Sequence, residues 1–303
     1  VDPMGEYAPL VERLGGQVIE IAPDSPNHIS PMDVQMDMGS GDSPLSLKAD
    51  FLLSLCELVV GGRDGLQPIE KTVIDRCVRQ VYREMALGLE TAKTPLLQDL
   101  YEELLCQPEP EAKRIATALE LYCTGSLNLF NHPTNVNLNS RVVCFVLKGM
   151  GENLRKIAMH ITNDFVTSAV GNNFKNGVAT WCYFDEFHIL LRDPLTASYF
   201  VTVWKMLRKQ GCVPSALTQN VKDLLASREI ENILDNTDFM ILLSQAQSDR
   251  AILAKQIGIS EHQLSYITQS NSGEGLLFYG RVTIPFVDRF PRGEIYEPSL
   301  IQI

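Results

Sequence analysis

From about residue 140 onwards, short apolar segments alternate with longer amphipathic ones, and this alternation constrains the fold more than any other feature. The segments Val142–Leu147, Ala179–Phe184 and Val213–Leu217 have the length of strands and are almost wholly apolar. Strands of this kind are typical of a parallel sheet that is buried on both faces. Between them, Leu154–Val170 and Ala197–Lys209 have helical periodicity. The sequence therefore predicts an α/β domain with a mostly parallel sheet.

Shorter segments at both ends of the chain extend this prediction. Near the N-terminus we expect the end of a strand at Val1–Pro3, a brief helix up to Leu14 and a strand at Gln17–Ile21. Towards the C-terminus, turn residues and apolar runs predict the strand Phe239–Leu243, the helix Asp249–Ile257, and a terminal hairpin that pairs Leu276–Tyr279 with Val282–Pro285 around Gly280-Arg281.

Residues 43–125 have helical patterns only. Apolar residues recur every four positions at Ile69, Val73, Cys77, Val81 and Met85, which predicts one buried helix face. Thr94-Pro95 is typical of a helix start, with the proline in the first helical position. We therefore predict an all-helical insertion at 43–125 within a core formed by 1–42 and 126–303.

Composition excludes several classes of protein. The 303 residues carry 26 Lys+Arg against 37 Asp+Glu, a net charge of −11, which argues against a surface that coats a nucleic-acid duplex. No apolar run reaches the roughly 20 residues of a membrane-spanning helix. The seven cysteines include no CxxC pair and the five histidines are dispersed, so neither a disulfide scaffold nor a zinc site is expected.

Two adjacent carboxylates end one of the predicted strands. Asp185 and Glu186 follow the apolar segment Ala179–Phe184 directly, which places them at the edge where open α/β sheets bind ligands. In nucleotide hydrolases the first such acid holds the magnesium shell, and the second orients or deprotonates the attacking water. The alternative is that Asp185 only caps the helix that follows.

Polar residues after the next strand and at the end of the intervening helix suggest further parts of such a site. Gln219 follows the next strand, where an amide can hydrogen-bond a γ-phosphate or the attacking water; a solvated loop residue is the alternative. Arg208-Lys209 end the intervening helix and are followed by Gly211. Basic residues there suit the helix dipole, or they supply an arginine finger to a neighbouring subunit.

The order of these motifs along the chain resembles the motor domain of the conjugative type IV secretion traffic ATPases, which belong to the FtsK/HerA translocase superfamily. The Asp-Glu-Phe-His variant and the helical insertion are closest to the branch on mobile conjugative elements of Gram-positive bacteria. The resemblance covers essentially the whole chain and rests on Asp2-Pro3-Met4-Gly5-Glu6-Tyr7, Leu14-Gly15-Gly16, Ile29–Asp33, Thr134-Asn135, Asp185–His188, Arg208-Lys209-x-Gly211, Thr218-Gln219-Asn220 and Gly273-x-Gly275.

The resemblance implies a RecA-like P-loop NTPase core that uses ATP and Mg²⁺. It implies that Asp185, as the Walker B acid, holds the magnesium ion through water and that Glu186 is the catalytic carboxylate. Gln219 would sense the γ-phosphate, and Arg208-Lys209 would reach across a subunit interface. Glu6 is expected near the nucleotide, without an assigned role.

The family also implies a setting. Its members act as oligomers, typically hexamers, on the cytoplasmic face of the cell membrane, where they energise assembly of the secretion channel or transfer of DNA and protein through it. Channel subunits, coupling proteins and possibly DNA are the implied partners, and membrane association is peripheral.

One element of the family is missing from the sequence. No GxxxxGK[ST] phosphate loop occurs, and Gly39-Ser40-Gly41-Asp42-Ser43 lacks the lysine. The chain opens with Val1 at the segment that follows this loop in the family, so we expect a C-terminal piece of a longer protein. The loss of the first strand would leave an unpaired strand edge and an apolar groove. We expect these residues alone neither to hydrolyse ATP nor to bind it tightly.

Three alternatives stay open at this point. The chain is a DNA-pumping coupling protein, a non-catalytic docking module with a vestigial carboxylate pair, or a metal-dependent nuclease built on Asp185-Glu186. His188 lies three residues beyond Asp185, close enough in sequence to approach the site, but a packed or helix-surface histidine is the favoured expectation. Arg250, Arg281 and Tyr296 are weaker candidates for contacts with a nucleotide or a neighbour.

Overall fold

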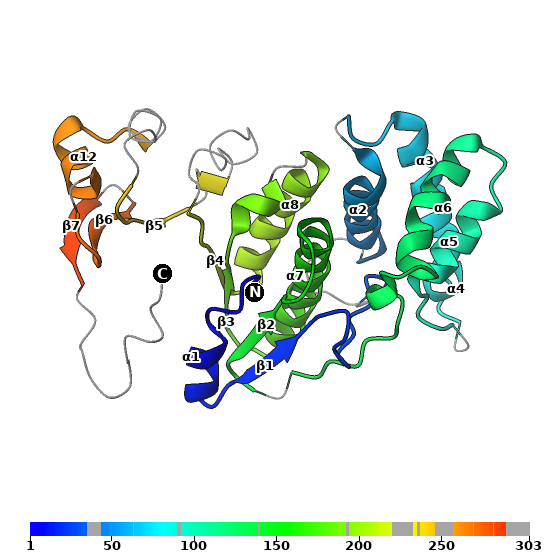
Figure 1. The fold of residues 1–303 in the computed structure, drawn as a ribbon, viewed down its shortest axis with the longest axis horizontal. Coiled ribbons are helices and arrows are strands. Elements are labelled where there is room, and N and C mark those ends of the chain that lie inside the picture. Colours follow the sequence, from blue (N-terminus) through cyan, green and yellow to red (C-terminus); the bar gives the residue numbers. More distant parts are fainter. Residues whose placement is uncertain are drawn as a thin grey trace. The chain divides into compact units, whose positions relative to one another are not determined.

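The computed structural model describes residues 1–34, 44–62, 64–89, 92–138, 140–191, 194–219, 233–234, 237–245, 257–268, 270–280 and 282–288. The chain divides into two compact units, Val1–Leu217 and Thr218–Ile303, each of which is described by itself (Figure 1). None of the helices in the described ranges is both long and apolar enough to cross a membrane.

The first unit contains two pairs of parallel strands. β1 (Gln17–Glu20) pairs with β2 (Val143–Val146), and β3 (Thr180–Phe184) pairs with β4 (Cys212–Ala216). All four strands lie within one residue of their predicted positions, and the prediction of a parallel sheet is confirmed here. Parallel strands of this kind end at a common edge, so the carboxyl ends of β3 and β4 lie side by side.

Val1 and Asp2 join the two pairs of strands. Asp2 N donates to Phe145 O at 2.8 Å, and Leu147 N donates to Asp2 O at 3.2 Å. On the other side, the Val1 ammonium donates to Tyr183 O at 2.6 Å and Asp185 N donates to Val1 O at 3.1 Å. The predicted strand end at Val1–Pro3 is therefore confirmed for its first two residues. Outside this contact the described strands remain two separate two-stranded sheets.

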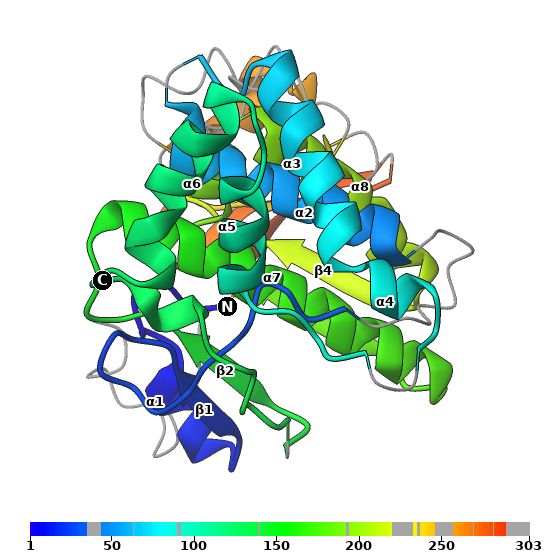
Figure 2. The same ribbon diagram turned by 90° about the vertical axis from the view of Figure 1, so that its right-hand side faces the viewer.

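Two long helices pack against the sheet of this unit. α7 (Glu152–Lys175) contacts β3, and α8 (Pro194–Lys209) contacts β4; Figure 2 shows α7 and β4 from the side of the helical segments. α1 (Ala8–Arg13) packs on β1 and β2 through Val11. All three helices were predicted, with α7 extending seven residues beyond the expected range.

The opposite face of β3 and β4 is open, contrary to the prediction of strands buried on both faces. Trp181 is 65% exposed, Tyr183 56% and Val213 44%, whereas Cys182 and Phe184 are buried. The reason is that α7 and α8 cover only one face of this strand pair in the described part of the unit. Buried and exposed residues therefore alternate along β3, although its sequence is apolar almost throughout.

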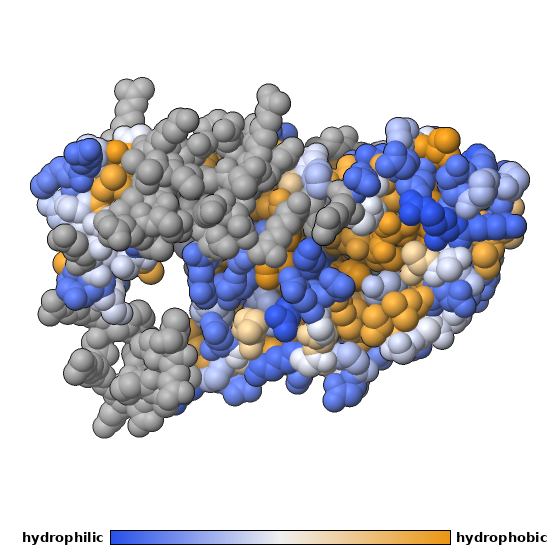
Figure 3. Space-filling model, turned by 45° about the horizontal axis from the view of Figure 1, so that its top comes forward, coloured by the Kyte–Doolittle hydropathy of each residue, from blue (hydrophilic) through white to orange (hydrophobic). Residues whose placement is uncertain are grey.

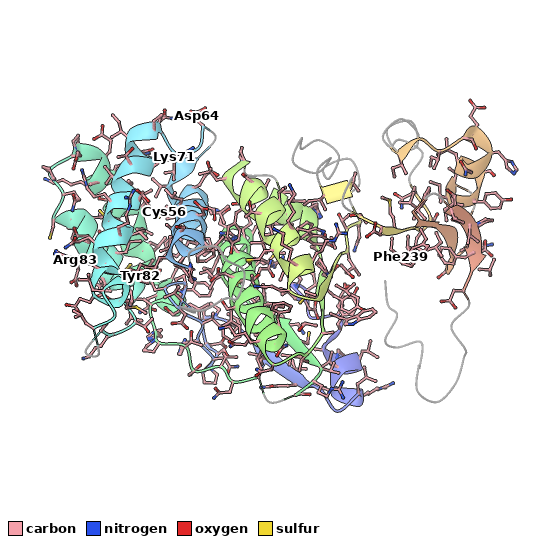
Figure 4. The ribbon with its side chains drawn as sticks, turned by 180° about the vertical axis from the view of Figure 1, so that it is seen from behind. Cys56, Asp64, Lys71, Tyr82, Arg83 and Phe239 are labelled. Carbon is pink, nitrogen blue, oxygen red and sulfur yellow. The ribbon has the colours of Figure 1, made fainter. Side chains whose placement is uncertain are left out.

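In the described part of residues 44–130, helices joined by loops are the only secondary structure. Figure 4 shows this helical region from behind, with Cys56 and Tyr82 labelled. They are α2 (Pro44–Cys56), the π-helix η1 (Glu57–Gly61), α3 (Pro68–Val81), α4 (Arg83–Ala86), α5 (Leu97–Leu105), α6 (Pro110–Cys123) and the 3₁₀ helix η2 (Asn128–Phe130). On the face that Figure 3 shows, apolar side chains of this helical region reach the surface in places between polar ones.

The predicted periodicity of α3 is confirmed in its centre and fails at its ends. Val73 and Cys77 are buried, but Ile69 is 56% exposed and Met85 lies beyond the helix. The predicted helix start at Thr94-Pro95 is wrong by two residues, because Asp99 Oδ2 accepts the backbone N–H of Leu96 at 2.6 Å. This side chain makes Leu96, and not Thr94, the residue that caps α5.

Two carboxylates, one buried and one partly buried, attach the helical region to α8. Glu57 on η1 is 7% exposed, and its Oε2 accepts the backbone N–H of Leu195, in the first turn of α8, at 2.8 Å. Asp164 on α7 accepts hydrogen bonds from Lys48 Nζ on α2 at 2.5 Å and from the Tyr199 hydroxyl on α8 at 2.9 Å. The helix dipole also stabilises a negative carboxylate at the N-terminus of a helix.

His160 is fully buried between α2, α7 and α8. Its Nε2 lies 2.6 Å from the Ser54 hydroxyl, and its ring packs against Phe51, Tyr199 and Phe200. Burial lowers the pKa of His160 from 6.5 to about 3, with nearby Lys48 adding to this effect. The ring is therefore neutral in the folded protein near neutral pH.

The second unit is a separate antiparallel sheet with one described helix. β5 (Phe239–Leu242), β6 (Glu274–Tyr279) and β7 (Val282–Val287) lie in that order, and α12 (Glu261–Thr268) packs on β6. The predicted hairpin is confirmed, with Gly280 at φ 56° in its turn. Gly275 is required because a Cβ there would lie 2.2 Å from Leu242 O.

The strand predicted at Phe239–Leu243 exists, but it does not extend the parallel sheet. It pairs antiparallel with β6, from Phe239 opposite Tyr279 to Leu242 opposite Leu276. Nearly all of the predicted helix Asp249–Ile257, the segment Gly39–Ser43, Arg250, Arg281 and Tyr296 lie outside the described residues.

We predict that Glu57→Ala lowers the free energy of unfolding by about 2 kcal/mol, because the Leu195 amide loses an ionised acceptor in a buried site. Denaturant unfolding measures this change. Glu120→Ala, at an exposed position of α6, is the matched control and should change stability by less than about 0.5 kcal/mol. Equal effects of the two changes would contradict the role of Glu57.

We predict that His160 makes the protein less stable in acid. Its folded-state pKa lies below the unfolded value of 6.5, so its contribution is present above pH 6.5 and is lost as the pH falls, by roughly 1 kcal/mol for each pH unit. In His160→Gln this part of the slope should vanish. Unfolding experiments between pH 7 and pH 4 on both proteins measure the difference, and identical slopes would refute the prediction.

Candidate active site

The backbone of Leu217 fixes both ends of the turn that carries Asp185 and Glu186. Leu217 N donates to Phe184 O at 2.9 Å, and Phe187 N donates to Leu217 O at 3.0 Å. Phe184 closes β3, and Phe187 opens the 3₁₀ helix η3 (Phe187–Leu191). The two carboxylates therefore occupy a two-residue connection between backbone positions that are each held by the strand end of β4.

Aromatic packing fixes the same two positions from inside the unit. Phe184 and Phe187 are both buried, with ring centroids 6.1 Å apart. Phe187 also packs edge-on against Phe200, at 5.4 Å, and near Trp204, at 5.5 Å, both on α8. Large buried rings of this kind resist displacement. The turn cannot lengthen without moving either this cluster or β4.

Glu186 takes a backbone conformation that side chains disfavour. Its φ is 49°, and it is the one residue other than glycine with positive φ in the described ranges. An L-residue in this left-handed region costs roughly 1–2 kcal/mol. Strain of this kind persists where surrounding contacts fix the backbone, and it is common at functional sites. Here the fixed positions of Phe184 and Phe187 supply those contacts.

The charges of three other carboxylates act on Asp185. The pKa of Asp185 is raised, first by burial and then by the charges of Glu186, Asp2 and Glu6, although a backbone hydrogen bond from Glu186 opposes the shift. The pKa of the Tyr7 hydroxyl is raised by burial and by the same acids. The edge of the sheet beside β3 is therefore strongly acidic.

Asp2 organises the segment that carries Glu6. Its Oδ1 accepts the backbone N–H groups of Gly5 at 2.6 Å and Glu6 at 3.1 Å, and its Oδ2 accepts that of Tyr7 at 2.8 Å. Gly5 has φ 76°, and Lys148 lies so close that a Cβ would meet it. The side chain of Asp2 thereby folds the Asp2–Tyr7 segment back beside the Asp185–Glu186 turn. The Asp-Pro-x-Gly pattern is a recognisable turn signal, but the sequence alone does not assign this role to Asp2.

His188 contacts Glu186. Its Nδ1 lies 3.2 Å from Glu186 Oε2, with side-chain exposures of 10% and 18% respectively. The structure therefore brings His188 to the carboxylate pair, where it is also a packed residue. The helix that follows Asp185 directly is η3, which begins two residues later, so whether Asp185 caps it stays a prediction.

The other predicted site residues lie elsewhere. Arg208 and Lys209 are in the last turn of α8, close to Gly211, whose carbonyl accepts the N–H of Thr180 at the opposite end of β3. The 16 residues of α8 span about 24 Å, so these two side chains lie far from Asp185 and Glu186 of their own chain. Gln219 is exposed, lies two residues after Leu217 and belongs to the second unit, so its position relative to Glu186 stays a prediction.

The carboxylates do not form a ready-made metal cage. Among the described residues, no three His, Cys, Asp or Glu side chains converge as ligands of one ion. Their mutual repulsion is nevertheless what a divalent cation relieves, and Mg²⁺ commonly keeps several water ligands. The donor set thus fits a cation that is held mainly through water.

We predict that Glu186→Gly is more stable than Glu186→Ala by about 1 kcal/mol, because glycine adopts the left-handed conformation without strain. Both changes remove the carboxylate, so the difference isolates the backbone. The same pair at Glu120, inside α6, should show the reverse order by a similar amount. Chemical unfolding of the four variants tests this, and the same order at both positions would contradict the strained turn.

Comparison with solved structures places this arrangement in a known fold. VirB4 of Thermoanaerobacter pseudethanolicus is similar with a TM-score of 0.82 and 23% identity, over 96% of this chain and 81% of that one. The bacterial conjugative coupling protein TrwB, in its unbound form, gives 0.53 and 12% identity over 96% and 85%. The plasmid coupling protein TrwB in complex with the GTP analogue GDPNP gives 0.52 and 12% over 97% and 86%.

No protein-family model matches the sequence, and no curated protein matches it. At these identities the likeness is one of fold. The fold class expected from the sequence motifs is thereby confirmed, and the chain has the RecA-like α/β fold that VirB4 and the conjugative coupling protein TrwB share.

Proposed function

We propose that this chain is the C-terminal ATPase domain of a conjugative type IV secretion ATPase. The observation that carries this proposal is the pair Asp185-Glu186, which follows β3 directly and occupies a strained, doubly anchored turn. The fold supports it, because VirB4 resembles this chain with a TM-score of 0.82, against 0.53 for TrwB. That difference also favours a traffic ATPase over a DNA-pumping coupling protein.

ATP with Mg²⁺ is the proposed ligand of the intact protein. Solved structures of TrwB contain the nucleotide analogues GDPNP and ADPNP, and the acidic edge of this chain suits a hydrated cation. Bound Mg²⁺ would neutralise charge on the phosphates. Asp185 would hold the water ligands of this ion, and Glu186 would orient the attacking water and accept its proton.

The remaining roles are assigned by position. Gln219, which follows β4, would report the presence of the γ-phosphate. Arg208, together with Lys209, would act on the nucleotide of a neighbouring subunit, since α8 carries both to the far edge of their own sheet. The charge of Glu6 helps to raise the pKa of Asp185. Glu6 would therefore border the nucleotide.

The proposed assembly is an oligomer, a hexamer in its intact form. It would sit peripherally at the cytoplasmic face of the membrane, held by type IV secretion channel and coupling proteins. Turnover would drive channel assembly or the transfer of DNA or protein. A non-catalytic docking module is the second candidate, because the helical region is held against α8 by Glu57 and Asp164 and offers a large outer surface.

These 303 residues alone are proposed to be inactive. The sequence contains no GxxxxGK[ST], so it supplies neither the backbone cradle nor the lysine that bind the β- and γ-phosphates. Micromolar binding of Mg-ATP to this chain in calorimetry would contradict the proposal of inactivity.

We predict that Glu186→Gln abolishes ATP turnover, by at least about a hundredfold, in a protein that carries this chain together with a phosphate loop. Nucleotide affinity should be retained, because glutamine keeps the shape of the side chain. Phosphate release and nucleotide binding are the measurements, and Glu120→Gln is the matched control. Unchanged turnover, with wild-type transfer in conjugation assays, would support the docking module. DNA-stimulated, strongly salt-dependent turnover would instead support the pump.

A further inference from the structure

We propose that His188 is a positioning residue, whose Nδ1–H holds the carboxylate of Glu186 in the orientation needed to align the attacking water. This proposal rests on the proposed ATPase function for its kinetic meaning. Its structural content, a hydrogen bond donated by His188 Nδ1 to Glu186 Oε2, is independent of that function. In the sequence the two partners lie in Asp-Glu-Phe-His, with Phe187 between Glu186 and His188.

The turn leaves Glu186 little freedom. Its backbone is fixed at φ 49° between two anchored phenylalanines, and Ile189 N donates to Glu186 O at 3.0 Å, which closes the turn from the other side. A residue held in this way directs its side chain along a path that the backbone sets. The side chain of Glu186 can still rotate about its outer bonds, and a hydrogen-bond partner at the carboxylate can fix these torsions.

His188 is itself anchored and is therefore suited to this task. It lies in η3 with 8% of its surface exposed, directly after Phe187, whose ring packs into the cluster with Phe200 and Trp204. η3 contacts both α7 and α8. The imidazole is thus attached to the rigid part of the unit and does not follow movements of the exposed edge.

Like charges surround the turn. The charges of Glu186, Asp2 and Glu6 all act on Asp185, and neighbouring carboxylates repel one another. Among the described residues, His188 is the basic side chain that the structure places on Glu186. Its bond to Oε2 counters this repulsion and leaves Oε1 as the acceptor for water.

The first test reads the protonation of the His188 ring directly. Long-range ¹H–¹⁵N NMR of this chain at neutral pH should show a proton on Nδ1 of His188, either in the neutral ring or in the imidazolium. His188→Asn identifies the resonance by its loss. Glu186→Ala should shift the Nδ1 resonance, whereas Glu120→Ala should not. An unprotonated Nδ1, or an Nδ1 resonance that ignores Glu186→Ala, would overturn the proposal.

The second test uses a protein that carries the phosphate loop. His188→Leu should lower kcat by about tenfold or more, a part of the contribution of a general base, with KM for ATP changed less than twofold. His188→Asn, whose amide N–H can replace Nδ1–H, should recover most of the loss. In a Glu186→Gln background, His188→Leu should have no further effect on turnover.

The outcomes separate this inference from the proposed function. If Glu186→Gln does not reduce turnover, the proposed function fails, and the NMR result alone decides whether the hydrogen bond exists. A purely structural role predicts that His188→Leu and His188→Asn lose activity equally, in proportion to their loss of folded protein in thermal unfolding. That pattern, or a change in KM with kcat intact, would refute positioning.

Discussion

The hydrogen bonds that the backbone of Leu217 makes to Phe184 and Phe187 are the constraint on which the rest of the candidate site depends. They tie the end of β3 and the start of η3 to the end of β4, so that only two residues bridge a fixed gap. The cost of this geometry appears as the left-handed conformation of Glu186. Its benefit is a carboxylate whose position is set by the sheet and not by a mobile loop.

α8 links this turn to the helical region. Its N-terminus bonds to Glu57 on η1, its middle bonds to Asp164, and its aromatic residues pack on Phe187. α8 thus makes a continuous set of contacts from the helical region to the residues that flank the carboxylate turn. Glu57 is the first residue of η1, and π-helical segments are often found at functional positions.

The sequence predicts the elements of the first unit well, because apolar runs and helical periods are local properties. The same locality explains where prediction stops. The conformation of Glu186 depends on Leu217, 31 positions further along the chain, and the contact between Glu57 and Leu195 spans 138 positions. The antiparallel pairing of β5 with β6 could not be predicted either, because an apolar run does not reveal whether the strand beside it is parallel or antiparallel.

Individual errors have the same origin. α5 begins at Leu97, and not at Pro95, because the side chain of Asp99 accepts the backbone N–H of Leu96. The carboxylate pair was correctly placed after β3, since a strand end can be read from its own residues. The partner of Glu186 could be found only as one of several readings of His188, because spacing alone does not give the orientation of a ring.

The open face of β3 and β4 has a practical consequence, which follows from the two tryptophans of the chain. Trp181 stands on that face and is 65% exposed, whereas Trp204 is 6% exposed, beneath the carboxylate turn. The intrinsic fluorescence of the protein therefore has a component that aqueous quenchers reach and one that they do not. The quenchable fraction reports whether another surface covers the sheet, while the protected fraction reports the integrity of the aromatic cluster.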